Sequence, residues 1–220
     1  MWTYAASPKR PEMRLLPYGD AAVLVDCKTL TEALGWRDAL AAAAVEGVEE
    51  LVPAARTVLV RLRPETARAA KRSIAALRPP QVSDREEGMH REAEREPVTI
   101  SVSYDGPDLD EVGDLTGLGA DGVVAAHIEA MWRVAFCGFA PGFGYLVGGD
   151  ECLQVPRRRE PRARVPAGAV GLAGEFSGVY PRESPGGWQL IGRTDAVLWD
   201  TERKPSALLR PGVPVRFRPL

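Results

Sequence analysis

The order of apolar and polar positions predicts a mixed helix-and-strand arrangement in the first part of the chain. Short apolar runs over 21–25, 49–53 and 57–62 have the length of strands and are bounded by polar or turn-forming residues. Thr29, followed three residues later by Glu32, has the spacing of a capping box and predicts a helix that begins there.

Glycine and proline positions set the limits of two helices in this part. Gly47 is the expected stop of the first helix, and Pro64 is the expected first residue of a second one, which ends before Pro79. The order strand, helix, two strands, helix predicts an α+β fold of ferredoxin-like type over residues 14–80, with both helices on one face of an antiparallel sheet.

The segment 81–97 has a different composition from its surroundings. It reads QVSDREEGMHREAEREP, so most of it is charged and little of it is apolar. Such a segment cannot bury enough surface to fold by itself, and we expect a linker or exposed loop there. His90 lies inside it and is expected to be a surface histidine.

The remaining residues, 98–220, predict a compact β-barrel. Residues 98–104 alternate as a strand, and 108–133 predict two short helices separated by Gly117-Leu118-Gly119, the second capped by Asp121. After Met131 the chain carries more than half of all its glycines and prolines, which leaves room only for short strands and turns.

Charge and composition exclude several classes of protein. The chain has 220 residues, 45% of them hydrophobic, and 28 basic against 30 acidic residues give a net charge of −2. The helix pair over 108–133 is acidic, so neither a nucleic-acid partner nor a helix-turn-helix is expected. No apolar stretch has the length of a membrane span, and no secretory leader is present, so we expect a cytoplasmic protein without a membrane contact. Three cysteines without CxxC spacing and two histidines predict no metal site.

His127 is the first candidate for chemistry. It shares a helical face with Val123, Val124 and Met131, so a histidine packed into the core is one interpretation. The functional interpretation rests on the loop that follows at 136–146, FCGFAPGFGYL, in which glycines and a proline stand among aromatic residues. The N–H groups of such a loop can hold a carboxylate or oxyanion, although the loop is equally typical of a packed barrel corner.

An arginine-rich segment at 156–166, PRRREPRARVP, is the best candidate for an anion site. Guanidinium groups pair bidentately with carboxylates and phosphates, and the prolines stiffen the segment. Trp188 follows the turn Ser184-Pro185-Gly186-Gly187 and is either core or a pocket wall. Cys137 has no nearby base in the sequence and is expected to be a buried thiol. Phosphate-binding-loop, amidase-type serine and biotin-acceptor motifs are absent from the sequence.

These motifs together resemble a family of 5-oxoprolinase subunits that is also called allophanate hydrolase subunit 1 and that includes a bacterial sporulation-kinase inhibitor. The resemblance runs from about Leu16 to Pro219. It rests on GDAA at 19–22, VPA at 52–54, His127, GFAPGFGYL at 138–146, VPRRREPRARVPAG at 155–168, GVYP at 178–181 and SPGGWQLIGRT at 184–194.

The resemblance implies an N-terminal α+β domain and a cyclophilin-like β-barrel. It also implies a second subunit with a related barrel, two copies of each chain, and a third subunit in the oxoprolinase form. That assembly opens the lactam ring of 5-oxoproline to L-glutamate with hydrolysis of ATP in the presence of Mg²⁺. The sequence does not decide which subunit binds ATP.

Site roles follow from the resemblance as expectations. His127 would be catalytic and move protons at the barrel mouth. The residues expected to bind the substrate carboxylate or a phosphoryl group, or to wall the pocket, are Arg157, Arg162, Arg193, Tyr145, Trp188, Gly142 and Gly144.

Two departures from the family pattern leave the substrate open. Glu175-Phe176-Ser177 stands before Gly178-Val179-Tyr180-Pro181, and Val147 interrupts the expected Tyr-Leu-Gly-Gly. Two alternatives to the oxoprolinase subunit therefore remain: an amidolytic or carboxyl-transfer subunit for urea-derived substrates, and a non-catalytic inhibitor of a histidine kinase.

Overall fold

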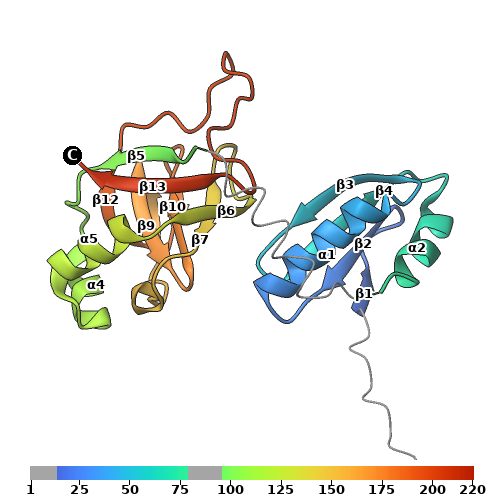
Figure 1. The fold of residues 1–220 in the computed structure, drawn as a ribbon, viewed down its shortest axis with the longest axis horizontal. Helices are drawn as coiled ribbons and strands as arrows, with labels where there is room; N and C mark the ends of the chain where they lie inside the picture. Colours follow the sequence, from blue (N-terminus) through green and yellow to red (C-terminus); the bar gives the residue numbers. More distant parts are fainter. Residues whose placement is uncertain (1–13, 79–95) are drawn as a thin grey trace, which may run out of the picture. The chain divides into compact units, whose positions relative to one another are not determined.

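The computed structural model describes residues 14–78 and 96–220, which belong to two compact units. Figure 1 shows both units, with colours that follow the sequence. Nearly all of the predicted linker over 81–97, with His90, lies outside the described residues. The expected domain limits of 14–80 and 98–220 therefore stay predictions.

The first unit is a four-stranded antiparallel sheet with two helices, in the sheet order β1-β2-β4-β3. The succession β2-α1-β3-β4-α2 is the predicted one, and a strand that the sequence did not indicate, β1, occupies the edge beside β2. The elements are β1 (Arg14–Pro17), β2 (Ala22–Asp26), α1 (Leu30–Ala43), β3 (Val48–Pro53), β4 (Thr57–Leu62) and α2 (Ala67–Ala75).

Local chemistry explains where the two helices begin. The N–H of Glu32 donates to Thr29 Oγ1 at 3.1 Å, and the Glu32 carboxylate accepts from the N–H of Lys28 at 2.7 Å, which confirms the N-cap at Thr29. The second helix begins at Ala67 rather than at Pro64, because residues 64–66 form a turn closed by Thr66 N–H on Arg63 O.

Both helices pack on one face of the first sheet, as predicted. Alternate residues of β4, Val58, Val60 and Leu62, are buried, and they share a core with Trp36 of α1 and Ile74 of α2. The first helix ends at Ala43, before the expected stop at Gly47, and Ala44 takes the left-handed conformation with φ 43°.

The second unit is a barrel-like sheet of seven strands in the order β12-β9-β10-β7-β6-β13-β5, which confirms the predicted barrel. Its edges meet where Ser103 and Arg193 exchange backbone hydrogen bonds of 2.8 and 2.9 Å. The elements are β5 (Val98–Val102), α4 (Leu109–Thr116), α5 (Gly119–Glu129), β6 (Trp132–Cys137), β7 (Gly144–Val147), the 3₁₀ turn η1 (Glu151–Leu153), β8 (Arg162–Val165), β9 (Ala169–Ala173), β10 (Phe176–Val179), β11 (Ser184–Gly186), β12 (Gln189–Arg193) and β13 (Pro214–Pro219).

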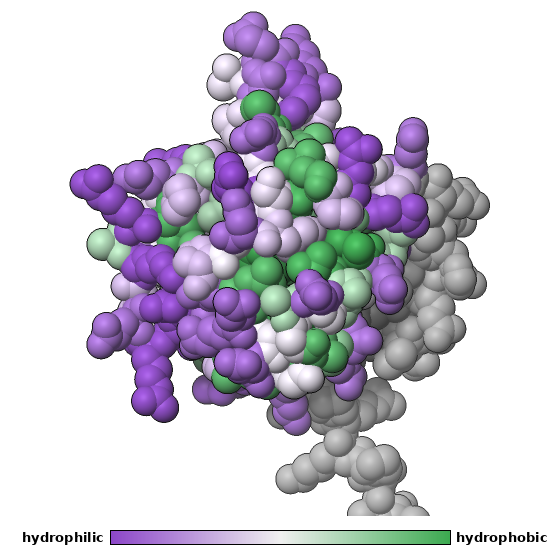
Figure 2. All heavy atoms as spheres, turned by 90° about the vertical axis from the view of Figure 1, so that its left-hand side faces the viewer, coloured by the Kyte–Doolittle hydropathy of each residue, from purple (hydrophilic) through white to green (hydrophobic). Residues whose placement is uncertain are grey.

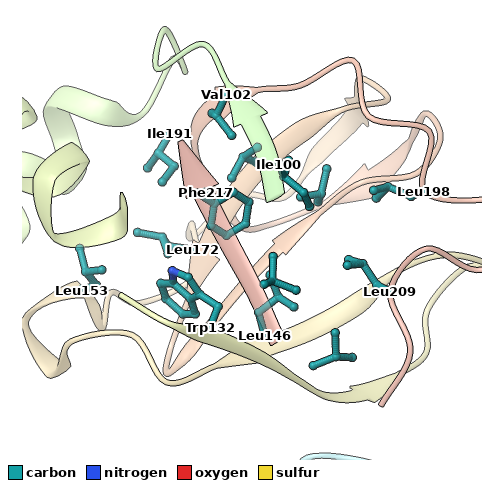
Figure 3. Close-up of a cluster of buried hydrophobic side chains, with 14 of the residues drawn as sticks. Ile100, Val102, Trp132, Leu146, Leu153, Leu172, Ile191, Leu198, Leu209 and Phe217 are labelled. Atoms are coloured by element: carbon teal, nitrogen blue, oxygen red, sulfur yellow. The ribbon is translucent and has the colours of Figure 1, made fainter. Parts of the chain in front are cut away.

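The barrel wall separates two clusters of buried side chains. The interior is filled by large apolar residues, among them Trp132, Leu172, Ile191 and Phe217, which point toward one another (Figure 3). A second cluster, with Phe143, Tyr180, Trp188 and Leu190 among its members, lies against β9, β10 and β12 beside the small β8–β11 sheet. The alternation of side chains along a strand produces these two faces.

The two helices of this unit run in succession before β6, and both contact the sheet. Helix α5 packs on β13 and α4 packs on β12. The second of them begins at Gly119 with Leu118 at its N-cap, so Asp121 lies in the first turn and is not the cap that was expected.

The surface of the barrel unit is mostly hydrophilic on the face shown in Figure 2, with apolar side chains in separate areas between polar ones. Large apolar side chains exposed in this unit include Leu115, Met131, Phe139, Val197 and Trp199. Within residues 14–78 and 96–220, no helix has the length and apolar character needed to cross a membrane.

Closure of the barrel gives the first testable prediction. A Cβ added at Gly192 would lie 2.6 Å from Ser103 O, so Gly192→Ala should push β12 away from β5 and lower the free energy of unfolding by about 1–3 kcal/mol. Gly138→Ala is the matched control, since its Cβ would meet nothing nearer than 3.8 Å. Urea unfolding of both variants measures the difference, and equal stabilities would contradict tight closure at this point.

Candidate functional site

An aromatic pocket with one arginine lies beside the β8–β11 sheet. The cavity has a volume of about 100 Å³. It combines ring faces and edges with a guanidinium group and the backbone of a glycine turn, a mixture typical of sites for small charged molecules. Its lining consists of Phe139, Phe143, Tyr145, Arg157, Tyr180, Gly186, Gly187 and Trp188.

Edge-to-face contacts hold the aromatic walls in place. The ring of Phe143 lies 5.4 Å from Trp188 and 5.0 Å from Tyr145, and Tyr145 lies 5.7 Å from Trp188, all steeply inclined to one another. Gly178 of β10 permits this packing, because a Cβ there would lie 3.0 Å from both Phe143 and Trp188. Burial raises the pKa of Tyr145, so its hydroxyl is neutral at physiological pH.

Arg157 is the cation of this pocket. Arg157 is exposed, and within the described part of the chain no carboxylate lies within ion-pair distance of its guanidinium. Its charge acts on Tyr145 and Tyr180, where it partly offsets the effect of burial on their pKa values. A guanidinium without a counter-ion beside aromatic walls is suited to bind a carboxylate attached to a small, weakly polar body.

Two neighbouring arginines are paired with a buried carboxylate instead. Arg158 Nη1 donates to Asp108 Oδ1 at 2.8 Å, and Arg162 donates two bonds to Asp108, at 2.9 Å to Oδ2 and 2.7 Å to Oδ1. Asp108 is 2% exposed, so these bonds lie in a largely dry environment. The guanidinium of Arg162 is thus occupied by Asp108, and its expected role in substrate binding stays a prediction.

Asp108 is also tied to the strand that follows Trp188. The N–H of Leu190 donates to Asp108 Oδ2 at 2.7 Å, and the N–H of Asp108 donates to Leu190 O at 3.0 Å. Burial by itself raises the pKa of Asp108, but the bonds from Arg162 and Leu190 and the two guanidinium charges outweigh it, so the pKa is lowered. The carboxylate is thus ionised and saturated with donors.

Three further candidates lie outside this pocket. Arg193, at the end of β12, pairs with Asp105 through Nε at 2.9 Å in an exposed position. Gly142 has φ 86° and lies beside Trp199, and Gly144 is a strand residue paired with Cys137. None of the three lines the aromatic pocket.

The glycine-rich loop is organised mainly by its own backbone. The N–H groups of Gly138, Ala140 and Phe143 donate to carbonyl oxygens within the loop, at 3.3, 2.7 and 3.0 Å. These three donors are therefore not available to an oxyanion, which favours the packed-corner interpretation. The loop contributes the rings of Phe139 and Phe143 to the pocket instead.

His127 lies on the inner side of the barrel wall and is fully buried. Its Nδ1 is hydrogen-bonded with the Tyr104 hydroxyl at 2.8 Å and its Nε2 with the Ser177 hydroxyl at 2.9 Å. Its ring packs on Phe217 at 4.3 Å. Burial lowers the pKa of His127 to about 3, so the ring is neutral.

Strand β10 lies between His127 and the aromatic pocket. Ser177 faces the histidine, whereas the next residue, Gly178, faces Phe143 and Trp188, because successive strand positions point to opposite sides. The structure therefore does not bring His127 together with Tyr145 and Trp188. Its packing matches the core interpretation, and a catalytic role for it stays a prediction.

A second cavity, of about 190 Å³, is lined by acidic residues, whereas the aromatic pocket carries the positive charge of Arg157. Asp150, Glu151 and Glu175 line it together with Trp132 and Phe176. The family departure at Glu175 thus lies at this cavity and not at the pocket of Arg157. Phe176 also reaches the ring of Tyr145, 5.6 Å away, so it supports the outer wall of the aromatic pocket.

Cys137, expected to be a buried thiol, is only partly shielded from solvent. It is half-buried, its sulfur donates to Leu209 O at 3.6 Å, and burial raises its pKa. Within the described residues, no group of three or more histidine, cysteine, aspartate or glutamate side chains is arranged to hold a metal ion.

The chain thus combines an α+β unit with a barrel-like sheet that carries a pocket on the outer side of its wall. The chain belongs to the family described as "Carboxyltransferase domain, subdomain C and D", whose model matches residues 13–209. This match confirms the resemblance drawn from the motifs, as do curated relatives at 43–48% identity, each of which is named as a subunit of 5-oxoprolinase.

Individual comparisons extend this result. The 5-oxoprolinase subunit from Escherichia coli O157:H7 is 48% identical over 137 residues, which are 61% of this chain and 63% of the relative, so the match spans less than two thirds of it. The crystal structure of TTHA0988 in space group P212121 is 33% identical with a TM-score of 0.70, over 90% of this chain and 40% of that longer chain. The urea amidolyase of K. lactis shares the fold at 17% identity and a TM-score of 0.68, over 97% of this chain and 15% of that one.

The environment of His127 predicts a pH dependence of stability. Its folded pKa of about 3 is below the unfolded value of 6.5, so the unfolded chain takes up a proton that the folded chain does not. The free energy of unfolding should therefore fall as the pH drops from 6.5 toward 3, by about 1.4 kcal/mol per pH unit from this group. His127→Gln should be less stable at pH 7 but lack this part of the slope.

Urea unfolding between pH 4.5 and 7.5 tests the prediction, with wild type and variant compared at each pH. Both proteins retain His90 and all carboxylates, so the difference between the two slopes isolates residue 127. Parallel slopes would show that folding does not lower the pKa of His127.

Proposed function

We propose that this chain is one subunit of a heteromeric, ATP-dependent 5-oxoprolinase, which converts 5-oxoproline, ATP and water to L-glutamate, ADP and phosphate. The names of relatives at 43–48% identity support this activity. The structural observation that supports it most is the aromatic pocket in which Arg157 has no carboxylate partner among the described residues.

The chemistry of 5-oxoproline fits such a pocket. The molecule is a five-membered lactam ring that carries one carboxylate. Arg157 would bind the carboxylate through a forked pair of hydrogen bonds, while the rings of Tyr145 and Trp188 would pack on the lactam and exclude water. Arg158 and Arg162 would take no part, because Asp108 occupies both of them.

The aromatic pocket of this chain does not suit ATP with Mg²⁺. The pocket of about 100 Å³ offers one arginine, which suits a carboxylate or a single phosphoryl group but not a whole nucleotide. No cluster of metal-ligating side chains accompanies it in the described ranges. We therefore assign ATP binding to the other subunits of the complex.

The partners are proposed with the activity. They are a second subunit with a related cyclophilin-like barrel, in a complex of two copies of each chain, and a third oxoprolinase subunit, all in the cytoplasm. The curated relatives are named as subunits of an enzyme, which supports a complex of several chains. The urea-type amidolytic or carboxyl-transfer role and the kinase-inhibitor role remain predictions that activity measurements on the complex distinguish.

Coexpression with the two other subunits tests the proposed function. The complete complex should release L-glutamate from 5-oxoproline when ATP and Mg²⁺ are supplied, and a preparation that lacks only this chain should release none. Size-exclusion chromatography shows whether the complex has formed. A stable complete complex without glutamate release would contradict the oxoprolinase role, and a chain that stays monomeric in coexpression would contradict the assembly.

Arg157→Ala tests the binding site within that complex. Losing a charge-assisted pair of hydrogen bonds to the carboxylate should raise KM for 5-oxoproline about tenfold or more. Arg164→Ala is the matched control, because Arg164 is 82% exposed and makes only a 3.9 Å contact with Glu183. Steady-state kinetics on the assembled complex measure both values. Equal KM values for the two variants would place the carboxylate elsewhere.

A further inference from the structure

Asp108 connects three segments that border the aromatic pocket. Through its carboxylate it holds Arg158 and Arg162 of the arginine-rich segment, and through its carboxylate and its own N–H it holds Leu190. Leu190 lies two residues after the pocket wall Trp188. A single buried side chain is thus linked to both sides of the site.

The same segment is fastened to the floor of the pocket by its backbone. The N–H of Arg158 donates to Gly187 O at 2.8 Å, and Arg162 pairs with Gly186 between β8 and β11. Arg157 therefore lies next to Arg158 in the chain. The main chain of Arg158 is bound to the glycine turn, and its side chain is bound to Asp108. The main chain that carries Arg157 is thereby restrained beside the glycine turn.

Arg157, Arg158 and Arg162 differ in whether a carboxylate neutralises their charge. Arg158 and Arg162 lie 2.8 and 2.7 Å from the Asp108 carboxylate, with side chains only 28% and 23% exposed. Arg158 has a second, weaker carboxylate neighbour in Glu111 at 3.7 Å. Only the charge of Arg157 is left without a counter-ion among the described residues at the pocket. A ligand carboxylate is thereby directed to one guanidinium.

We propose that Asp108 is the positioning residue of this site, acting on substrate through Arg157 and Trp188. It withdraws Arg158 and Arg162 from the pocket, anchors the segment that presents Arg157, and fixes the strand that carries Trp188. This inference rests on the proposed function for the identity of the substrate, but its basis is the side-chain arrangement alone.

Kinetics on the assembled complex give the first test. Asp108→Asn keeps the size of the side chain but removes the charge that holds two guanidinium groups, so KM for 5-oxoproline should rise about tenfold, as for loss of an ion-paired contact. In the double variant with Arg157→Ala the two effects should be clearly less than multiplicative, because both act on the same contact. Asp105→Asn, which breaks the exposed pair with Arg193, is the control and should leave KM unchanged.

A second variant keeps the test decisive if Asp108→Asn does not fold. Arg158→Gln leaves the Asp108–Arg162 pair intact and alters a side chain that is 28% exposed, so we expect this variant to fold. It loosens the residue next to Arg157, and KM should rise several-fold with little change in kcat. An unchanged KM for Arg158→Gln, or fully multiplicative effects of Asp108→Asn and Arg157→Ala, would overturn the proposal.

Nuclear magnetic resonance on the full chain separates this proposal from the proposed function. With ¹⁵N-labelled arginine, acetate serves as a carboxylate probe that needs no partner subunit. Acetate should shift the Nε–Hε signal that Arg157→Lys removes, and leave the Arg158 and Arg162 signals in place. In Arg158→Gln the shift of the Arg157 signal should be reduced.

The acetate titration and the glutamate-release assay together distinguish a failure of the positioning role from a failure of the oxoprolinase role. A selective acetate shift at Arg157 without glutamate release from the complete complex would reject the oxoprolinase role and support the positioning role. Glutamate release together with equal acetate shifts at all three arginines would reject the positioning role and leave the proposed function in place.

Discussion

The buried carboxylate of Asp108 is the interaction on which the organisation of the site depends. Removing an ionised carboxylate from water is costly, and here two guanidinium groups and a backbone N–H compensate it within 2.7–2.9 Å. The same bonds join the start of α4, the arginine-rich segment and the first residues of β12. Without that charge, two cations and a pocket wall would lose their common anchor.

The wall of the barrel then decides which side chains can act together. Strand β10 presents Ser177 to the interior, where it meets His127, and Gly178 to the outer cluster, where Phe143 and Trp188 meet. His127 is thereby a neutral, doubly hydrogen-bonded part of the core. The pocket on the other side of the wall combines aromatic rings with the guanidinium of Arg157.

The sequence predicted the elements better than the site. Apolar periodicity and the capping residues located β3, β4 and the start of α1, and the glycine and proline spacing predicted the barrel. Which arginine is free depends on contacts across 50 or more residues, such as Arg158 with Asp108, and local patterns carry no information about them. In the sequence Asp108 is one of several acidic residues in the helix pair over 108–133, and nothing in the local pattern marks it as the counter-ion of Arg158 and Arg162.

The central claim is that a substrate carboxylate is directed to Arg157 because Asp108 occupies Arg158 and Arg162. The most direct test is a crystal structure of the assembled complex with 5-oxoproline bound. The account predicts the carboxylate within hydrogen-bond distance of the Arg157 guanidinium, with both Asp108 ion pairs intact. A carboxylate bound to Arg162, or a ligand in the acidic cavity lined by Glu175, would contradict it.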